Sequence, residues 1–184
     1  MIGKKNIVFG FLYLVLTAAL GPYMIVKLFP DVGSAMVQKQ QALGRLQQLK
    51  TNGFEENLEP LDAKQIAKVN TDGILALNQL GNAEAPIDAV KGGAHAHGNL
   101  EALLNIAAGL VLCFVAVARW FKQLISWVFI LGALLHSGML YLSLLGVGFA
   151  ETLLKAGPPL VLLALFLMGV AALMGFRGEL VRDD

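Results

Sequence analysis

Four runs of apolar residues divide the chain, at 7–26, 100–118, 124–145 and 158–176, and each is bounded by charge, glycine or proline. A helix needs about 18–25 apolar residues to cross the hydrocarbon core of a bilayer, and each run has roughly that length. Lipid offers no hydrogen-bond partner to an open strand, so all four runs are expected to be helices. The pattern therefore predicts an all-α, polytopic membrane protein with four transmembrane helices.

Composition supports the same class of protein. Of the 184 residues, 57% are hydrophobic and 15% charged, whereas soluble domains average about 45–50% apolar and about 25% charged residues. The mean hydropathy is +0.67 and the net charge is +1. Such a balance predicts membrane lipid as the surroundings and gives no basis for a nucleic-acid partner.

The first apolar run has two interpretations. Two lysines, an apolar centre and the small pair Ala18 and Ala19 are features of a cleavable signal peptide. However, apolar residues continue past Pro22 as far as Lys27, which favours an uncleaved transmembrane helix over 1–27. Pro22 is expected to kink that helix, because proline removes one backbone donor.

Basic residues in the short connections predict the orientation of the helices. Three regions are basic: the N-terminal segment with Lys4 and Lys5, the link with Arg119 and Lys122, and the C-terminal tail with Arg177 and Arg182. Four crossings would place all three on the same side of the membrane. The opposite short loop, 146–157, carries one glutamate and one lysine. Lysine and arginine are enriched in cytoplasmic loops, so both termini are expected to be cytoplasmic, in a multi-pass protein of a bacterial inner membrane.

The segment 28–93 is then extracytoplasmic. Apolar residues at helical spacing predict one helix over 34–50, with Ser34 as its N-cap, and a second from near Asp62 to Gly81. Residues 51–60 are expected to form a turn and 82–93 a linker. The segment is interpreted as a helical hairpin that caps the outer mouth of the bundle. Two helices lying in the membrane interface are the alternative, but glutamine rather than lysine or arginine dominates their polar faces.

The chain is thus expected to have three parts. Residues 1–27 form the first transmembrane helix and 28–93 the extracytoplasmic helical cap. Residues 94–184 form a three-helix transmembrane unit, with helices at about 97–118, 124–146 and 158–176, and a short cytoplasmic tail.

Polar residues inside the predicted membrane segments indicate an interior network. His97, Glu101 and Asn105 are four residues apart and share one helix face. Counted from the inner helix ends at about 1.5 Å per residue, Asn105 matches His136 in depth and Glu101 matches Tyr141, while His97 lies roughly 13 Å above His136. The predicted network therefore comprises these five residues. It serves either a metal, haem or proton site or interhelical hydrogen bonding that fixes the helix register.

The sequence HAHG at the head of the second run suggests a metal site made of His95, His97 and Glu101. Histidines two apart diverge on a helix, so they converge on one ion only where Gly92 and Gly93 keep the segment extended. In that case the three donor atoms are expected within about 4–5 Å of one point. A structural role predicts instead that His95 diverges into solvent while His97 and Glu101 bond locally. The sequence does not distinguish a metal ion from a haem as the cofactor.

The stretches AHAHGNLEALLNIAAGLVL and ISWVFILGALLHSGMLYL carry a resemblance that covers about 94–175. They resemble small uncharacterised bacterial four-helix membrane proteins with a HAHG-type motif at the start of the second transmembrane helix. The resemblance implies the fold and no activity. No pattern of that group carries over to His136 or to the segment 28–93.

The sequence contains no phosphate loop, nucleophile elbow, HExxH or CxxC motif, and its single cysteine is Cys113. A non-enzymatic structural or accessory component of the membrane is therefore the expected function. A haem- or metal-binding redox protein that uses the HAHG region and a small oligomeric path for protons or solutes are the alternatives. A protein partner or a second copy of the chain is compatible with each of the three.

Overall fold

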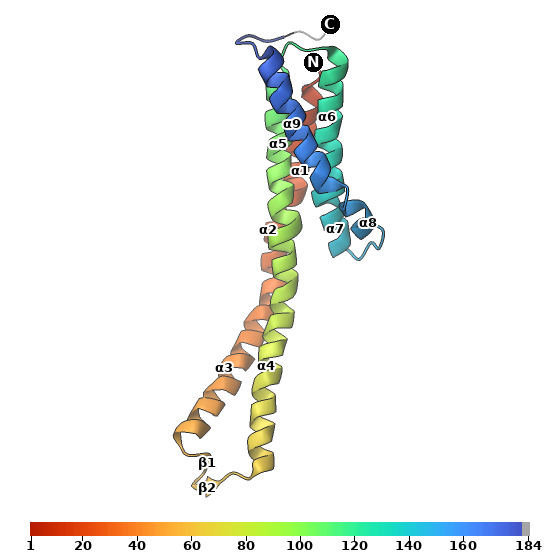
Figure 1. Ribbon diagram of the computed structural model, residues 1–184. Helices are drawn as coiled ribbons and strands as arrows, with labels where there is room; N and C mark the ends of the chain where they lie inside the picture. Colours follow the sequence, from red (N-terminus) through yellow and green to blue (C-terminus); the bar gives the residue numbers. More distant parts are fainter. Residues whose placement is uncertain (182–184) are drawn as a thin grey trace. The chain divides into compact units, whose positions relative to one another are not determined.

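The structure of the protein is a computed structural model that describes residues 1–181 and is built almost wholly of helices (Figure 1). It contains two compact units. Met1–Pro22 and the chain from Ala89 onward form the first, here called the bundle unit, and Tyr23–Asp88 forms the second, the hairpin unit. Arg182, used above to predict orientation, lies outside the described residues.

The bundle unit is formed chiefly by four helices, which lie side by side in Figure 1: α1 (Lys4–Ala18), α5 (Ala96–Leu112), α6 (Arg119–Ala133) and α9 (Gly157–Gly175). The π-helical segment η2 (Val90–His95) leads into α5, and η3 (Leu134–Gly138) continues α6 into α7 (Met139–Leu144). The short helix α8 (Ala150–Leu154) precedes α9. At the other end of α9, Ala116 N donates to Gly175 O over 2.7 Å, which ties the α5–α6 connection to the end of the bundle.

Three helices among the described residues are long and apolar enough to cross a membrane: Lys4–Thr51, Arg119–Leu144 and Ala150–Gly175. The most apolar 18-residue stretches within them have mean hydropathies of 1.9, 1.7 and 2.2. The crossing expected at 100–118 is not among them, for two reasons. The helix α5 ends at Leu112 rather than at Ala118, and its first half carries histidine, asparagine and glutamate, which lower its mean hydropathy.

The buried face of α1 and its continuation is small and polar, whereas the exposed face is apolar. Residues three and four apart are buried: Gly3, Asn6, Gly10, Tyr13, Thr17 and Leu20. The exposed side chains include Val8, Phe11, Leu12, Val15 and Leu16. A 3–4 spacing is that of a helix packed along one partner, and polar side chains turned inward with apolar ones outward are typical of helices in lipid.

Glycine permits the close approach of α1 and α5. A Cβ atom on Gly10 would lie 2.6 Å from the carbonyl oxygen of Ala102, and one on Gly109 would lie 2.6 Å from the carbonyl oxygen of Gly3. Ordinary contacts of this kind are 3.4–4 Å. Small residues at such positions let two helix backbones meet, as they do in membrane helix pairs.

The hairpin unit contains α3 (Phe29–Thr51) and most of α4 (Ala63–Ala89), joined by the antiparallel pair β1 (Glu55–Glu56) and β2 (Glu59–Pro60). Asp62 and Gln65 cap the start of α4 reciprocally. Gln65 N donates to Asp62 Oδ1 over 2.7 Å, and Asp62 N donates to Gln65 Oε1 over 2.8 Å. This is the arrangement of a capping box, and it explains why α4 begins where the sequence places it.

Helix boundaries differ from the prediction in three places. Ser34 is not an N-cap, because α3 already begins at Phe29; its hydroxyl donates to the carbonyl oxygen of Asp31. The predicted linker 82–93 is helical, since α4 continues through Gly81 and Pro86 and η2 follows it.

The third difference concerns the connection between α5 and α6. Arg119 and Lys122 were expected in a tight link, but both lie in α6, and the link is 113–118. Around Pro22, regular α-helical bonding is interrupted as expected. The four-residue helix α2 (Leu20–Tyr23), which contains the proline, is followed by the π-helical segment η1 (Met24–Leu28).

Candidate metal centre

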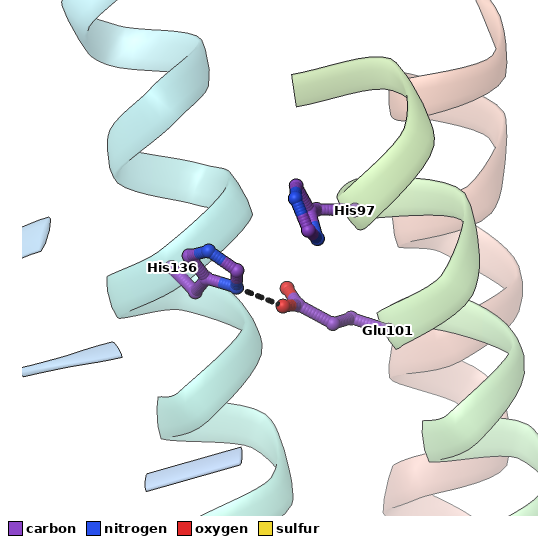
Figure 2. Close-up of side chains that lie close together, drawn as sticks. All are labelled: His97, Glu101 and His136. Atoms are coloured by element: carbon purple, nitrogen blue, oxygen red, sulfur yellow. Dashed lines mark hydrogen bonds and ion pairs between the residues drawn. The ribbon is translucent and has the colours of Figure 1, made fainter. Parts of the chain in front are cut away.

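Three side chains that can bind a metal converge between α5 and η3. His97 and Glu101 lie one turn apart on α5, and His136 faces them from η3 (Figure 2). One donor atom from each lies within 4.8 Å of the other two. The nearest pair, His136 Nδ1 and Glu101 Oε1, is 2.5 Å apart. The ring centroids of the two histidines are 4.6 Å apart, with the rings inclined at 50°.

Hydrogen bonds hold the Glu101 carboxylate in a fixed orientation. Its Oε1 receives the bond from His136, and its Oε2 receives bonds from Ser137 Oγ over 2.5 Å and Ser137 N over 3.3 Å. Glu101 is 3% exposed. A buried carboxylate is costly unless it is paired and hydrogen-bonded, and these three donors meet that need.

Tyr13 extends this set of bonds to α1. Its hydroxyl lies 2.8 Å from Ser137 Oγ and 3.3 Å from the carbonyl oxygen of Ala133. When Ser137 donates to Glu101, its oxygen accepts from Tyr13, so the chain of bonds runs Tyr13–Ser137–Glu101. Outer partners of this kind orient metal ligands and raise affinity.

The start of α9 fixes the backbone of His136. A Cβ atom on Gly157 would lie 2.5 Å from His136 Cα and 2.6 Å from His136 Cβ. Only glycine allows this contact. The segment η3 is π-helical, and short π-helical segments within α-helices are frequent at functional sites. The His136 side chain is 15% exposed, which leaves one side of the cluster accessible.

Two imidazoles and one carboxylate form a recognised ligand set. The same set, with a further position left for water or substrate, binds catalytic zinc and non-haem Fe(II). Bonds of about 2.0–2.2 Å place neighbouring ligand atoms roughly 3.3 Å apart around a tetrahedral ion. The His136–Glu101 pair would therefore open by roughly 0.8 Å around an ion, or the imidazole would turn and offer Nε2.

A haem bound by His97 and His136 does not fit the observed ring positions. Imidazoles on opposite faces of one iron, with bonds near 2 Å, place their ring centroids about 6 Å apart with the porphyrin between them. The observed separation is 4.6 Å. The cluster thus suits a bare ion better than a haem.

His95 lies apart from the other two histidines. Its Nδ1 is 3.0 Å from the carbonyl oxygen of Thr17, and Asn99 Nδ2 lies 3.5 Å from its ring nitrogens. The metal set suggested by the sequence, His95, His97 and Glu101, is therefore not the set that converges, because His136 takes the place of His95. Nor does His95 turn into solvent, since it contacts the backbone of α1.

Asn105 belongs to a separate polar layer, one turn of α5 away from Glu101. Asn6 Nδ2 donates to Asn105 Oδ1 over 3.0 Å, and Ser126 Oγ donates to Asn6 Oδ1. Asn105 Nδ2 donates to the carbonyl oxygens of Phe129 and Glu101. This layer joins α1, α5 and α6 through side chains that are all buried.

The depth match predicted for these residues is wrong. The sequence paired Asn105 with His136 and Glu101 with Tyr141, whereas Glu101 meets His136. The count took the second helix to Ala118 and the third from Leu124, whereas α5 ends at Leu112 and α6 begins at Arg119, so both depths were counted from the wrong helix ends. Tyr141 lines a small cavity together with Tyr13.

Five buried or partly buried polar residues of the site region escaped the sequence analysis: Asn6, Tyr13, Thr17, Ser126 and Ser137. A signal for those on α1 exists. Together with Gly3 and Gly10 they recur at intervals of three and four residues, whereas the residues between them from Ile7 onward are apolar. A comparison of the chain with protein-family models, curated proteins and solved structures finds no match.

Proposed function

We propose that the chain is a multi-pass membrane protein in which α5 is a fourth crossing beside the three long apolar helices. On α5 the exposed side chains include Leu100, Leu103 and Leu110, whereas Glu101 and Asn105 are buried. Two of the polar residues that lower the mean hydropathy of α5, Glu101 and Asn105, thus face protein, and the exposed leucines suit lipid. With four crossings, the basic connections favour cytoplasmic termini in a bacterial inner membrane.

The proposed function of the bundle unit is to bind a divalent transition-metal ion at His97, Glu101 and His136. The observation that carries the proposal is the convergence of three donor atoms within 4.8 Å, from two different helical segments. Ionisable residues inside a membrane bundle are costly and are commonly functional. Here Tyr13 and Ser137 orient the carboxylate, as outer partners do in metal sites.

Zinc or ferrous iron suits this ligand set best. Imidazole and carboxylate bind both ions, whereas thiolate and thioether ligands select Cu(I). The only thiol, Cys113, lies past the far end of α5, where its sulfur contacts the carbonyl oxygen of Gly109. With three protein ligands, a bound ion keeps a further position for water or a substrate.

A second function is favoured by one specific observation. The Glu101 carboxylate already has three hydrogen-bond donors without an ion. The same cluster can therefore act as a clamp between α5 and η3 in a non-enzymatic structural or accessory membrane component, alone or with a protein partner. In that case the protein folds and functions without a metal.

Metal analysis of the purified full chain separates the two functions. The protein is extracted in mild detergent, stripped with a chelator and titrated with Zn²⁺, and with Co²⁺ as a spectroscopic probe. Metal binding predicts one ion per chain, lost in Glu101→Gln and His136→Gln. His95→Gln is the matched control, because His95 is a neighbouring histidine outside the cluster, and it should bind normally.

The clamp predicts a different result. Wild-type protein would then bind no stoichiometric ion, and Glu101→Gln would change only its stability. Equal binding by wild type and by the double variant Glu101→Gln/His136→Gln would also overturn the metal proposal, because the ions would be held elsewhere.

A further inference from the structure

A second candidate site lies at the end of the bundle unit where α1 and α6 begin. Figure 1 shows the N-terminus and the start of α6 at the same end of this unit. Between the two helices lies a cavity of about 700 Å³. Pockets of roughly 300–1,000 Å³ are typical of small-molecule sites. The lining residues are Met1, Ile2, Lys4, Lys5, Val8, Phe9, Arg119, Gln123, Trp127 and Ile130.

The lining carries positive charge at one end. Lys4, Lys5 and Arg119 contribute three cations, and among the described residues no acidic side chain lines the cavity. Neither α1 nor α6 has a side-chain hydrogen bond at its N-cap. The first turns of both helices therefore add partial positive charge at this end of the unit. The cavity is complementary to an anion.

Lys5 is held in place within the wall. Its Nζ donates to Gln123 Oε1 over 2.5 Å and lies 4.2 Å from the ring centroid of Trp127. An ammonium group has three donors, so one remains for a ligand oxygen after the amide and the indole face are contacted. The charge is thus positioned before a ligand arrives.

Apart from Gln123, the rest of the lining is mainly apolar and continues into the exposed face of α1. Val8 and Phe9 lie one turn beyond the lysines, and Ile130 faces them from α6. Val8 is 48% exposed, and neighbouring apolar residues of α1 that suit contact with lipid are exposed as well. Trp127, at 51% exposed, has the amphipathic character of side chains at the membrane interface. A ligand that fits has an anionic head and an apolar tail.

We propose that this cavity binds the headgroup of an anionic glycerophospholipid, with an acyl chain lying along Val8, Phe9 and Ile130. Basic pockets between transmembrane helices are suited to anionic headgroups. Inorganic phosphate would satisfy the cations but not the apolar wall. The site is separate from His97, Glu101 and His136, so lipid binding is expected whether or not the chain binds a metal.

The test uses the delipidated full chain in a neutral detergent. Phosphatidylglycerol, phosphatidylcholine and inorganic phosphate are added separately, and bound lipid is measured by native mass spectrometry together with the thermal unfolding midpoint. Phosphatidylglycerol is expected to bind and to raise the midpoint. Phosphatidylcholine and phosphate are expected to leave it unchanged.

Two kinds of variant locate the bound lipid. Arg119→Gln should weaken phosphatidylglycerol binding about fivefold, the effect of one cation near a membrane surface. Arg177→Gln, which removes an exposed cation outside the lining, should not. Val8→Trp fills the cavity and changes neither the charge of its lining nor the basic residues that orient the chain in the membrane, so it should abolish phosphatidylglycerol binding. Phe11→Trp, on the exposed face of α1, should not.

Three results would overturn the proposal. Equal binding of phosphatidylglycerol and phosphatidylcholine would show that charge does not select the ligand. Stabilisation by phosphate alone, to the same extent as by phosphatidylglycerol, would show an anion site without lipid. Normal phosphatidylglycerol binding by Val8→Trp would place the lipid elsewhere on the chain.

Discussion

Replacing Gly157 by alanine tests the coupling of α9 to the candidate metal centre without changing any of its three proposed ligands. The added methyl carbon would lie 2.5 Å from His136 Cα and 2.6 Å from His136 Cβ, where ordinary contacts begin at 3.4 Å. His136 N lies closer still, so the start of α9 and η3 must separate by about 1 Å, because none of these atoms is the tip of a flexible side chain. Overlap of this kind costs about 1–3 kcal/mol.

A matched control lies on the same helix. A Cβ atom on Gly169 would meet nothing within 4 Å, so Gly169→Ala gains helix propensity, up to about 1 kcal/mol, and adds no overlap. Alanine at 157 gains less, because Gly157 is the first residue of α9. Both the smaller propensity gain and the overlap make Gly157→Ala less stable than Gly169→Ala, and the overlap contributes about 1–3 kcal/mol of the difference.

Thermal unfolding in detergent and Co²⁺ titration provide the two readouts. His136 is displaced with η3, so Gly157→Ala is expected to bind Co²⁺ more weakly than wild type, while Gly169→Ala binds as wild type does. Equal unfolding midpoints for the two variants would refute the packing argument. A destabilised Gly157→Ala with unchanged affinity would refute the coupling of α9 to the ligands.

Three other outcomes are expected. Asn6→Leu leaves Asn105 Oδ1 and Ser126 Oγ without their partner and should lower the free energy of unfolding by about 1–3 kcal/mol, measured against Phe11→Leu on the exposed face. Ser137→Ala removes the hydroxyl between Tyr13 and Glu101 and should weaken metal binding about 10–100-fold in the same Co²⁺ titration; unchanged affinity would exclude a positioning role. Reporter fusions in cells should give cytoplasmic signals after Lys5, Lys122 and Arg177, and external signals near Asn52 and Glu84; a cytoplasmic signal at Asn52 would refute four crossings.

Hydropathy predicted the helical class and the three long apolar helices, because burial in lipid acts on the average character of a segment. It is a poorer guide to α5. There the polar residues are concentrated on the protein-facing side, so the average falls although the exposed leucines suit lipid. Helix ends are set by local hydrogen bonds, and nothing in the apolar run 100–118 marks Leu112 as the last helical residue.

Part of the candidate site followed from spacing alone. His97 and Glu101 share a face because they are four residues apart, and the structure places them so. Their partner depends on the relative heights of two helices, and that height depends on the non-helical link 113–118. A sequence pattern within one helix cannot supply this offset, which is why His136 was assigned to Asn105.

In the hairpin unit, local sequence signals also failed to predict where a helix ends. Gly81 and Pro86 are residues that commonly end helices, yet α4 runs through both. Leu80 and Ile87 on either side of them are buried, so packing outweighs local propensity. The capping residue Asp62, by contrast, acts only on its own helix start, and the sequence predicted that the helix begins near it.

The two polar layers of the bundle unit have separable roles, although they share α5. The Asn6–Asn105–Ser126 layer joins three helices and offers no carboxylate or imidazole, so its loss should act on stability first. The Glu101 layer holds the side chains proposed to bind a metal. Asn105 Nδ2 donates to the backbone carbonyl oxygen of Glu101 over 3.0 Å. This bond connects the two layers and does not involve the Glu101 side chain. Damage to the first layer loosens the helix that carries Glu101, whereas Glu101→Gln leaves the first layer bonded. A variant that loses the metal yet keeps its unfolding midpoint therefore belongs to the second layer, and no variant of the first layer should behave in this way.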